Sequence, residues 1–376
     1  MARKIISLVA LLVLSLGAFA QSKPSGNKRD TLAVKSERLY LDVAFDFDFD
    51  NTEYAGSGIG PSETLFGVTL APALRYEWHE KHSLVAGVNM QKMFGSTRFL
   101  DNIGLIAYYQ FSGDKDRVLA GLFRREMLKG DYSEAFFSNV WLASNRLVQG
   151  LAYQYTYERG VMEVAVDWNG MISPERREEF RILYSNRTDI SKVFYGGAAL
   201  DVHHYANRST FVAGVVDDIK LNPYLGVKFN AFFDFDFRLG YLLSVQRDRM
   251  SASGWKKPMG GEFLFRMSRW GAFISNNIYV GENLLPLYNL VGKEGTPYGA
   301  DLYATDPFYG TTSYIYNRTA IGYERDFLKD RLKVKAELVL KTDGKRLYNQ
   351  QIISLAVNLA PKLYDKDERR KTRGER

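Results

Sequence analysis

The sequence of 376 residues contains no cysteine and only four histidines. Without cysteine the chain can form no disulfide framework and can carry no lipid anchor on a cysteine thiol. Beyond residue 20, no stretch approaches the roughly 18 consecutive apolar residues that a membrane-spanning helix requires. The chain must therefore be stabilised by an apolar core, or by a membrane that it crosses without helices.

The first twenty residues have the pattern of a secretory signal peptide. Arg3 and Lys4 give a charged start, an apolar run follows from Ile5 to Leu16, and Ala18-Phe19-Ala20 provides a cleavage site of small residues. We therefore predict that the mature chain begins near Gln21.

Excess positive charge is also missing from most of the chain, although the net charge is +7. The segment 21–38 holds five basic and two acidic residues, and the segment 362–376 holds seven basic and four acidic residues. With the signal peptide set aside as well, the body 39–361 is nearly neutral. This distribution argues against a nucleic-acid partner, because a nucleic-acid surface concentrates Lys and Arg on the folded domain.

What the chain does have is strict alternation, seen first in Leu39–Phe49. Its odd positions are all apolar and its even positions include Asp42, Asp46 and Asp48. Since side chains on a strand alternate between faces, this segment predicts a strand with one apolar face and one acidic face. About eleven residues suffice for a tilted strand to cross a bilayer. The same F-D-F-D-F string returns at Phe233–Phe237.

Similar alternation over most of the chain predicts an all-β fold, a transmembrane antiparallel up-and-down β-barrel of about 16 strands, with 12 to 18 as the accepted range. Short turns alternate with longer connections along the chain, as in barrels with short periplasmic turns and long outer loops. An even number of strands then places both termini at the periplasmic end. The longest connections, 126–145 and 282–311, are expected to be outer loops, and 206–221 another loop. The predicted divisions are the signal peptide 1–20, a flexible periplasmic segment 21–38, the barrel 39–361 and a charged periplasmic tail 362–376. A soluble β-sandwich is the alternative, but its apolar face would not recur on nearly every strand.

The chain resembles the outer-membrane β-barrel proteins of Gram-negative bacteria, of the Bacteroidetes type. The resemblance covers Leu39 to Leu359 and rests on architecture, not on a diagnostic motif. The Gln at the predicted mature start, the strands rich in Phe, Tyr and Asp, and the string Ser173–Phe180 look like barrels of the Bacteroidetes type. It implies an outer-membrane location, outer-membrane lipid around the barrel, and insertion by the barrel assembly machinery.

If the apolar face meets lipid, many ionisable side chains point into the lumen. The candidate lumen or binding residues are Asp42, Asp46, Asp48, Glu163, Asp167, Glu179, Arg181, Asp201, Asp234, Asp236, Arg238, Lys333, Lys335 and Glu337. So many charged groups would be costly in a dry core, so we expect a lumen that is filled with water or laced with salt bridges. A transport pathway and a self-paired plug both fit this pattern.

Metal binding and catalysis have little support in the sequence. Acidic residues are frequent from Asp46 to Glu53, but alternate strand residues lie about 6.5 to 7 Å apart, too far for consecutive carboxylates to hold one cation. His82 and Ser83 are adjacent on a strand and face opposite ways, so they cannot pair as base and nucleophile. We predict no metal, no cofactor and no enzymatic activity, with a lipid hydrolase as the less favoured alternative.

The function predicted from these features is a porin-like channel for small hydrophilic solutes. The main alternative is a non-transporting barrel whose long outer loops bind a glycan or a protein partner. Four Asn-Arg pairs and several tyrosines near strand ends suit a sugar-binding rim, although Asn is equally expected in turns and Tyr at a membrane interface.

Overall fold

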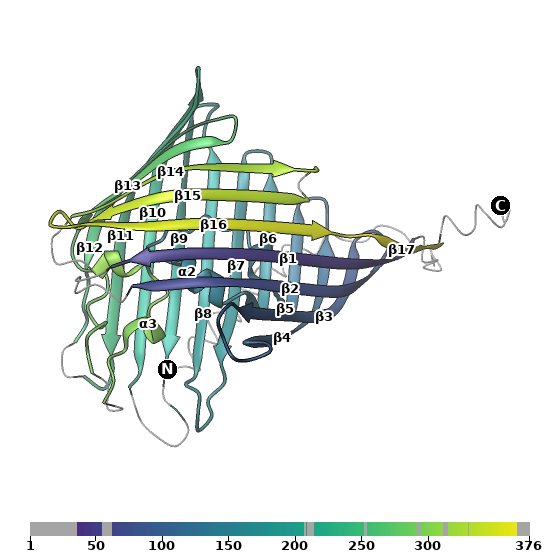
Figure 1. Cartoon of the computed structure of the whole chain (residues 1–376), viewed down its shortest axis with the longest axis horizontal. Helices are drawn as coiled ribbons and strands as arrows, with labels where there is room; N and C mark the ends of the chain where they lie inside the picture. The colour runs from purple at the N-terminus through teal and green to yellow at the C-terminus, as the bar shows by residue number, and fades with distance from the viewer. Residues whose placement is uncertain are drawn as a thin grey trace, which may run out of the picture. The chain divides into compact units, whose positions relative to one another are not determined.

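The computed structural model describes residues 36–54, 62–206, 208, 214–251, 254–291, 295–310, 315–329 and 331–366. Sixteen long strands make up nearly all of it (Figure 1). They are β1 (Glu37–Glu53), β2 (Glu63–Trp78), β3 (His82–Met93), β4 (Asn102–Ser112), β5 (Asp116–Arg124), β6 (Leu147–Tyr157), β7 (Gly160–Gly170), β8 (Glu179–Asp189), β9 (Phe194–Tyr205), β10 (Val216–Asn230), β11 (Asp234–Asp248), β12 (Met259–Arg269), β13 (Ala272–Gly281), β14 (Ile315–Phe327), β15 (Leu332–Thr342) and β16 (Leu347–Leu359). The predicted signal peptide and most of the segment 21–38 lie outside the described residues.

The strands close into one antiparallel barrel. Each strand pairs with the next along the chain, and β16 pairs with β1 from Val43↔Leu359 to Glu53↔Asn349. This confirms the predicted up-and-down barrel of sixteen strands. A short strand β17 (Lys362–Asp365) continues along β1 as far as Arg38↔Asp365, so the predicted charged tail begins as an extension of the sheet.

Connections of two kinds alternate around the barrel. Turns of two to four residues follow the even-numbered strands from β2 to β14, and most odd-numbered strands are followed by longer connections. The turn at His79 and Glu80 has φ values of 53° and 60°, and the turn at Leu328 and Lys329 has values of 54° and 57°. Left-handed turns of this kind match the right-handed twist of the paired strands. Both ends of the barrel-forming chain, at Glu37 and Asp365, lie at the short-turn end.

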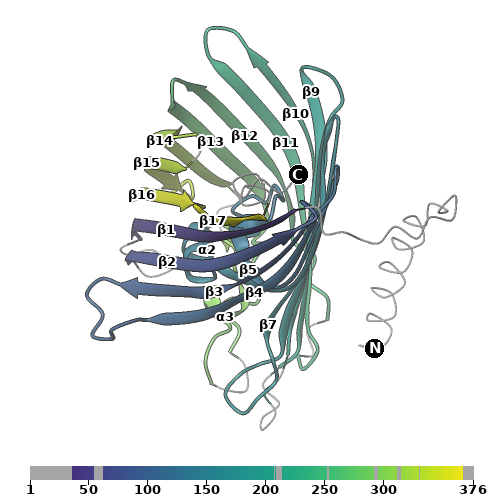
Figure 2. The ribbon, with the colours of Figure 1, turned by 90° about the vertical axis from the view of Figure 1, so that its right-hand side faces the viewer.

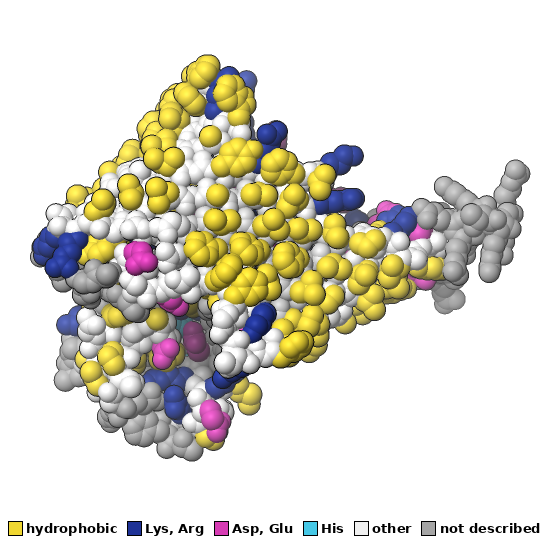
Figure 3. Space-filling view, viewed as in Figure 1, with side chains coloured by type: hydrophobic (Ala, Val, Ile, Leu, Met, Phe, Trp, Pro, Cys, Tyr) yellow, Lys and Arg dark blue, Asp and Glu magenta, His cyan; other side chains and the backbone are white. Residues whose placement is uncertain are grey.

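The two faces of the wall have opposite character, as the alternation predicts. On β1 the outward row includes Phe45, Phe47 and Phe49, whereas Asp46 and Asp50 face inward and are buried. Figure 3 shows hydrophobic side chains spread over the outward face of β1, β2 and β14 to β16. A continuous apolar outer surface is characteristic of a barrel embedded in lipid. None of the helices among the described residues has the length and apolarity needed to span a membrane.

Much of the two longest connections folds into the barrel, which corrects the expectation that they are wholly outer loops. Loop A (125–146) contains η1 (Arg125–Met127) and α2 (Asn139–Ser144); loop B, which is described at 282–291 and 295–310, contains α3 (Gly299–Leu302) and η2 (Pro307–Gly310). In loop B the stretches 284–287 and 302–309 are mostly buried, whereas Val291 and Pro297 between them are exposed. Figure 2 shows α2 and α3 within the ring of strands. The predicted loop 206–221 also needs correction, since β10 begins at Val216.

Loops A and B pack against each other and form one plug. The backbone N–H of Ser138 donates to the carbonyl of Ala304 at 2.7 Å, and the N–H of Asp306 donates to the carbonyl of Glu134 at 2.9 Å. Phe136 of loop A and Phe308 of loop B are fully buried in an apolar cluster that includes inward side chains from β5 round to β16. The plug and much of the inner wall of the barrel therefore share one hydrophobic core.

Candidate functional site

Loop A is held in place by carboxylates of the wall. Glu163 of β7 accepts hydrogen bonds from the backbone N–H groups of Lys129 and Gly130, at 2.5 and 2.9 Å. Asp167, two inward positions away on β7, accepts from Nη2 of Arg125 at 2.5 Å. Both carboxylates are buried, and buried carboxylates need such partners. These two predicted lumen residues thus fix the start of loop A.

Further along, loop A presents acidic side chains to arginines of the opposite wall. Asp131 accepts from Arg238 of β11 at 2.7 Å and from Arg187 of β8 at 3.4 Å. Glu134 forms an ion pair of 2.9 Å with Arg318 of β14. Burial alone would raise the pKa of Asp131, but the positive charges of Arg238 and Arg187 outweigh burial and hold that pKa below its ordinary value.

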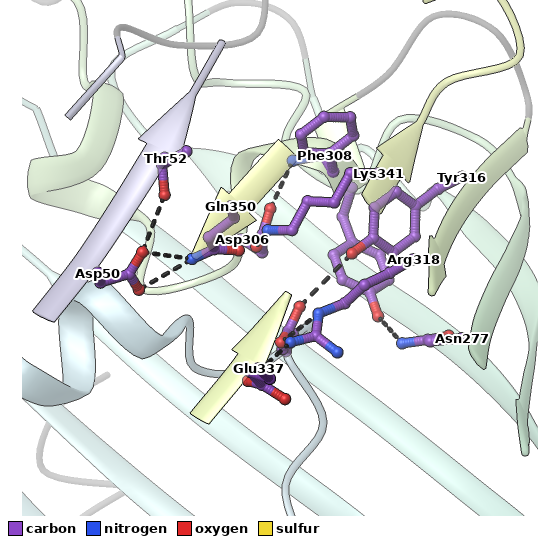
Figure 4. Close-up of polar contacts among 12 residues, drawn as sticks. Asp50, Thr52, Asn277, Asp306, Phe308, Tyr316, Arg318, Glu337, Lys341 and Gln350 are labelled. Carbon is purple, nitrogen blue, oxygen red and sulfur yellow. Dashed lines mark hydrogen bonds and ion pairs between the residues drawn. The ribbon is translucent and has the colours of Figure 1, made fainter. Parts of the chain in front are cut away.

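Loop B is fastened to the wall through a second set of buried polar contacts. Figure 4 shows Asp306 and Phe308 of loop B beside Lys341, and Tyr316 and Arg318 close by. Lys341 of β15 forms an ion pair with Asp306 and donates to the hydroxyl of Tyr54 at 3.1 Å. Next to this pair, the side chain of Gln350 donates to both oxygens of Asp50, at 2.7 and 2.8 Å.

A cavity of about 340 Å³, which we call the basic cavity, lies between loop A and the arc of wall from β8 to β14. Its charged lining consists of Arg187, Arg238, Arg266 and Arg318 together with Asp131, Glu134 and Asp236. Asp131 and Asp236 keep 32% and 38% of their side chains exposed, so these two carboxylates are in contact with water. Four arginines against three carboxylates leave the cavity slightly basic.

A second cavity, of about 230 Å³, lies on the opposite arc, against β1 to β4. We call it the apolar cavity because its wall is made of Ala44, Ala71, Ala73, Val85 and Ile106, which form a hydrophobic cluster of their own. The beginning of loop A, with Glu126 and Met127, closes its inner side.

All fourteen predicted lumen residues occupy inward positions of their strands, but they do not form a single site. Asp236 and Arg238 line the basic cavity, and Asp42 lines the apolar cavity. The others form mainly local pairs, among them Arg181 with Asp201 at 2.5 Å and Lys335 with Glu337 at 3.0 Å. Asp46 pairs with Arg124, the last residue of β5 before loop A, and Asp48 pairs with Arg146, the last residue of loop A. Lys333 bonds Glu324, Glu179 bonds His203, and Asp234 accepts from Asn230 near the short-turn end.

The residues that sequence reasoning missed belong mainly to the plug and to its wall contacts. Arg318 and Lys341 lie on the inward rows of strands that were predicted, so their alternation could have identified them. Asp131, Glu134 and Asp306 lie in segments without periodicity. Nothing in their spacing indicates that they enter the lumen.

Three histidines have well-defined partners in the structure. Nδ1 of His82 shares a hydrogen bond of 2.7 Å with the Tyr109 hydroxyl; His203 and His204 each lie 3.0 Å from a carboxylate, of Glu179 and Asp217. A carboxylate that orients a histidine is part of a serine-hydrolase triad, but these contacts identify no nucleophile in the described part of the chain. Nor do the described residues include a group of three or more His, Cys, Asp and Glu arranged to hold a metal ion.

Comparison with known proteins gives one family match and several structural ones. The model of the family described as "Lipid A 3'-O-deacylase-type" matches residues 30–206, which is less than half of the chain. The comparison with curated protein sequences finds no match.

Among solved structures, an outer-membrane protein of Vibrio cholerae, OmpT with loop L8 deleted, is similar with a TM-score of 0.50. It is 11% identical and the alignment covers 86% of this chain and 99% of that chain. OpdL of Pseudomonas aeruginosa has a TM-score of 0.48 at 10% identity, covering 87% of this chain and 99% of that chain. A mutant of the Rh. blastica porin has a TM-score of 0.42 at 11% identity, covering 85% and 100%. At these identities the likeness concerns the fold alone, a porin-like barrel.

Proposed function

We propose that the protein is a narrow channel in the outer membrane of a Gram-negative bacterium, through which small hydrophilic solutes diffuse. The observation that carries this proposal is the basic cavity, a water-accessible space lined by Asp131 and Glu134 of loop A and by the wall arginines that pair with them, Arg187, Arg238 and Arg318. Charges of both signs that face water suit a path for polar solutes, because an apolar lining would exclude them.

The plug sets the width of the path. Asp131 and Asp306 attach it to the wall through ion pairs, and the backbone of loop A is bound through Glu163. All of these contacts are non-covalent, so displacement of either loop widens the lumen without breaking a covalent bond. We therefore expect low basal conductance that rises when these contacts are removed.

Planar-bilayer recording on folded, heat-modifiable protein tests the proposal. Wild type should give small, discrete conductance steps. A double variant, Asp131→Asn with Glu134→Gln, removes the two acidic groups facing Arg187, Arg238 and Arg318, so it should conduct more and shift the reversal potential toward anion preference. Absence of conductance in both folded proteins would reject the channel.

The family match favours a second candidate function, the removal of an acyl chain from lipid A. The match covers His203, His204 and the strands that carry them, and His204 with Asp217 provides a histidine and carboxylate pair on the outward face. Mass spectrometry of lipid A incubated with the purified protein tests this candidate. Release of a fatty acid by wild type, lost in His204→Ala, would support it, and unchanged lipid A would exclude it.

The alternative of a loop-presenting barrel loses part of its motivation. It rested on the length of the two longest connections, and much of that length is buried as a plug. Phe136, Leu302 and Phe308 of these loops are completely buried and cannot contribute to an outer binding surface.

A further inference from the structure

The wall of the apolar cavity is made of small apolar side chains at inward positions of neighbouring strands. Ala44 of β1 and Ala71 of β2 are direct partners in register, and Ala73 lies at the next inward position of β2. These three methyl groups, together with Val85 and Ile106, are at most 9% exposed. Because the side chains are so small, the wall leaves space that a leucine at any of the alanine positions would occupy.

Carboxylates lie at both ends of this apolar wall. Asp42 lines one end, toward the short-turn end of β1, and Glu126 lines the other, beside Arg124. Arg124 also pairs with Asp46, which is four residues from Asp42 and so roughly 13 Å away along the strand. The cavity is thus an apolar strip between two acidic groups, and the side chains of Asp42 and Glu126 are 31% and 43% exposed.

The local charges do not balance. Three carboxylates form ion pairs with only two arginines here: Asp42 pairs with Arg75, whereas Asp46 and Glu126 both pair with Arg124. Nη2 of Arg124 is shared between Asp46 and Glu126, at 3.0 Å from the latter, and Nε and Nη1 are buried without a hydrogen-bond partner among the described residues. The hydrogen-bonded nitrogen of Arg124 is therefore divided between two carboxylates.

The state of Glu126 agrees with this imbalance. Burial inside the barrel raises the pKa of Glu126, the charge of Arg124 acts against that rise, and the nearby charge of Asp46 adds to it. A cation placed next to Glu126 would supply the charge that Arg124 provides only in part.

We propose that the apolar cavity binds small organic cations with a compact hydrocarbon group. The ammonium group pairs with Glu126, and the hydrocarbon group packs on Ala44, Ala71 and Ala73. The positive charge is selected by the excess of carboxylates, and the hydrocarbon group is selected because it buries apolar surface that water would otherwise cover. This site is separate from the basic cavity, and ligand can occupy it whether or not the barrel conducts.

Isothermal titration calorimetry on the full chain in lipid nanodiscs tests the site with three ligands of one shape. Cyclohexylammonium should bind saturably with one site per barrel, and cyclohexanecarboxylate and cyclohexanol should bind at least tenfold more weakly. Glu126→Gln and Ala73→Leu should each weaken cyclohexylammonium binding at least tenfold. Asp189→Asn is the matched control, because its carboxylate has similar exposure, 40%, and lies on β8, away from this cavity; its affinity should equal that of wild type.

The folded state of each variant is checked by heat-modifiable migration, and Glu126→Gln, in a partly exposed position of loop A, keeps the test valid if Ala73→Leu fails to fold. Equal affinity for the three ligands would overturn the proposal, because charge would then play no part. Undiminished binding in Glu126→Gln, or no binding to folded wild type, would overturn it as well.

Discussion

Lys341 of β15 and Asp306 of loop B form an ion pair that is almost completely removed from water, with 2% and 6% of their side chains exposed. The pair joins the wall to the plug on the side opposite the fixed start of loop A. Removing one member of a buried pair leaves an unpaired charge, which costs about 3–5 kcal/mol, whereas an exposed pair contributes about 0–1 kcal/mol.

Lys341→Met should therefore destabilise the closed plug by about 3–5 kcal/mol, because Asp306 would be buried without a cation. We expect earlier proteolytic cleavage within loop B and a higher bilayer conductance. The matched control is Lys333→Met on the same strand, whose ion pair with Glu324 has a lysine that is 51% exposed. If both variants have the same protease sensitivity as wild type, the buried pair does not hold the plug.

We expect loop A to become less tightly held at acidic pH, because the Asp131 carboxylate that anchors it becomes protonated. Its pKa is held below the ordinary value of about 3.9 by Arg238 and Arg187. Because the pKa of Asp131 is lower in the folded than in the unfolded protein, its carboxylate stabilises the folded loop fully at pH values above the unfolded-state pKa. This contribution is lost as the pH falls through the folded-state pKa. Hydrogen exchange of loop A amides should therefore accelerate relative to the strands as the pH is lowered from 5 to below 4, once corrected for intrinsic exchange rates.

The variant Asp131→Asn serves as the reference for that experiment. It should show faster exchange in loop A already at pH 5 and a smaller change on acidification than wild type. An identical pH response in the two proteins would show that another group is responsible.

Glu163 provides a prediction about the start of loop A. Its carboxylate accepts from two backbone amides and from the side chain of Gln154, and hydrogen bonds to a charged group contribute about 1.5–3 kcal/mol each. Glu163→Gln keeps the shape but removes the charge and one acceptor oxygen. We expect it to weaken protection of the Lys129 and Gly130 amides about tenfold or more in hydrogen exchange, with the barrel strands unaffected; unchanged protection would show that loop A is held by its apolar contacts alone.

The barrel was predictable from sequence because lipid and lumen impose opposite requirements on neighbouring residues. In β11, Phe235 and Phe237 alternate with Asp236 and Arg238, and this pattern alone assigns the two faces correctly. The start of β10 escaped prediction because Asp217 lies on the outward row, opposite Asp218 and Lys220, so polar residues occur on both faces there.

The plug was not predictable by the same reasoning. Asp131 is held by Arg238, which is 107 positions away in the sequence. Asp306 is held by Lys341, which is 35 positions away. No local period marks a loop that turns inward, since its backbone partners come from several distant strands. Length was the only available signal, and it is compatible with an inward or an outward loop.

The last prediction concerns depth on the outward face of β11. Phe235 is the second residue of the strand and packs on Phe229 with ring centroids 5.1 Å apart, near the short-turn end, whereas Leu239 lies closer to the middle and is 65% exposed. A cationic side chain on the lipid face costs about 2–4 kcal/mol at the midplane and about 0–1 kcal/mol near an interface. Leu239→Arg should therefore reduce the free energy of unfolding in lipid vesicles by about 2–4 kcal/mol. In Phe235→Arg the introduced charge should reduce this free energy by a smaller amount, and the loss of the aromatic contacts should reduce it somewhat further. The inward variant Asp236→Asn should fold as well as wild type, because its side chain faces the basic cavity and is not in contact with lipid. If Leu239→Arg is as stable as wild type, this stretch of β11 does not face the hydrocarbon core, and the placement of the membrane around the barrel must be revised.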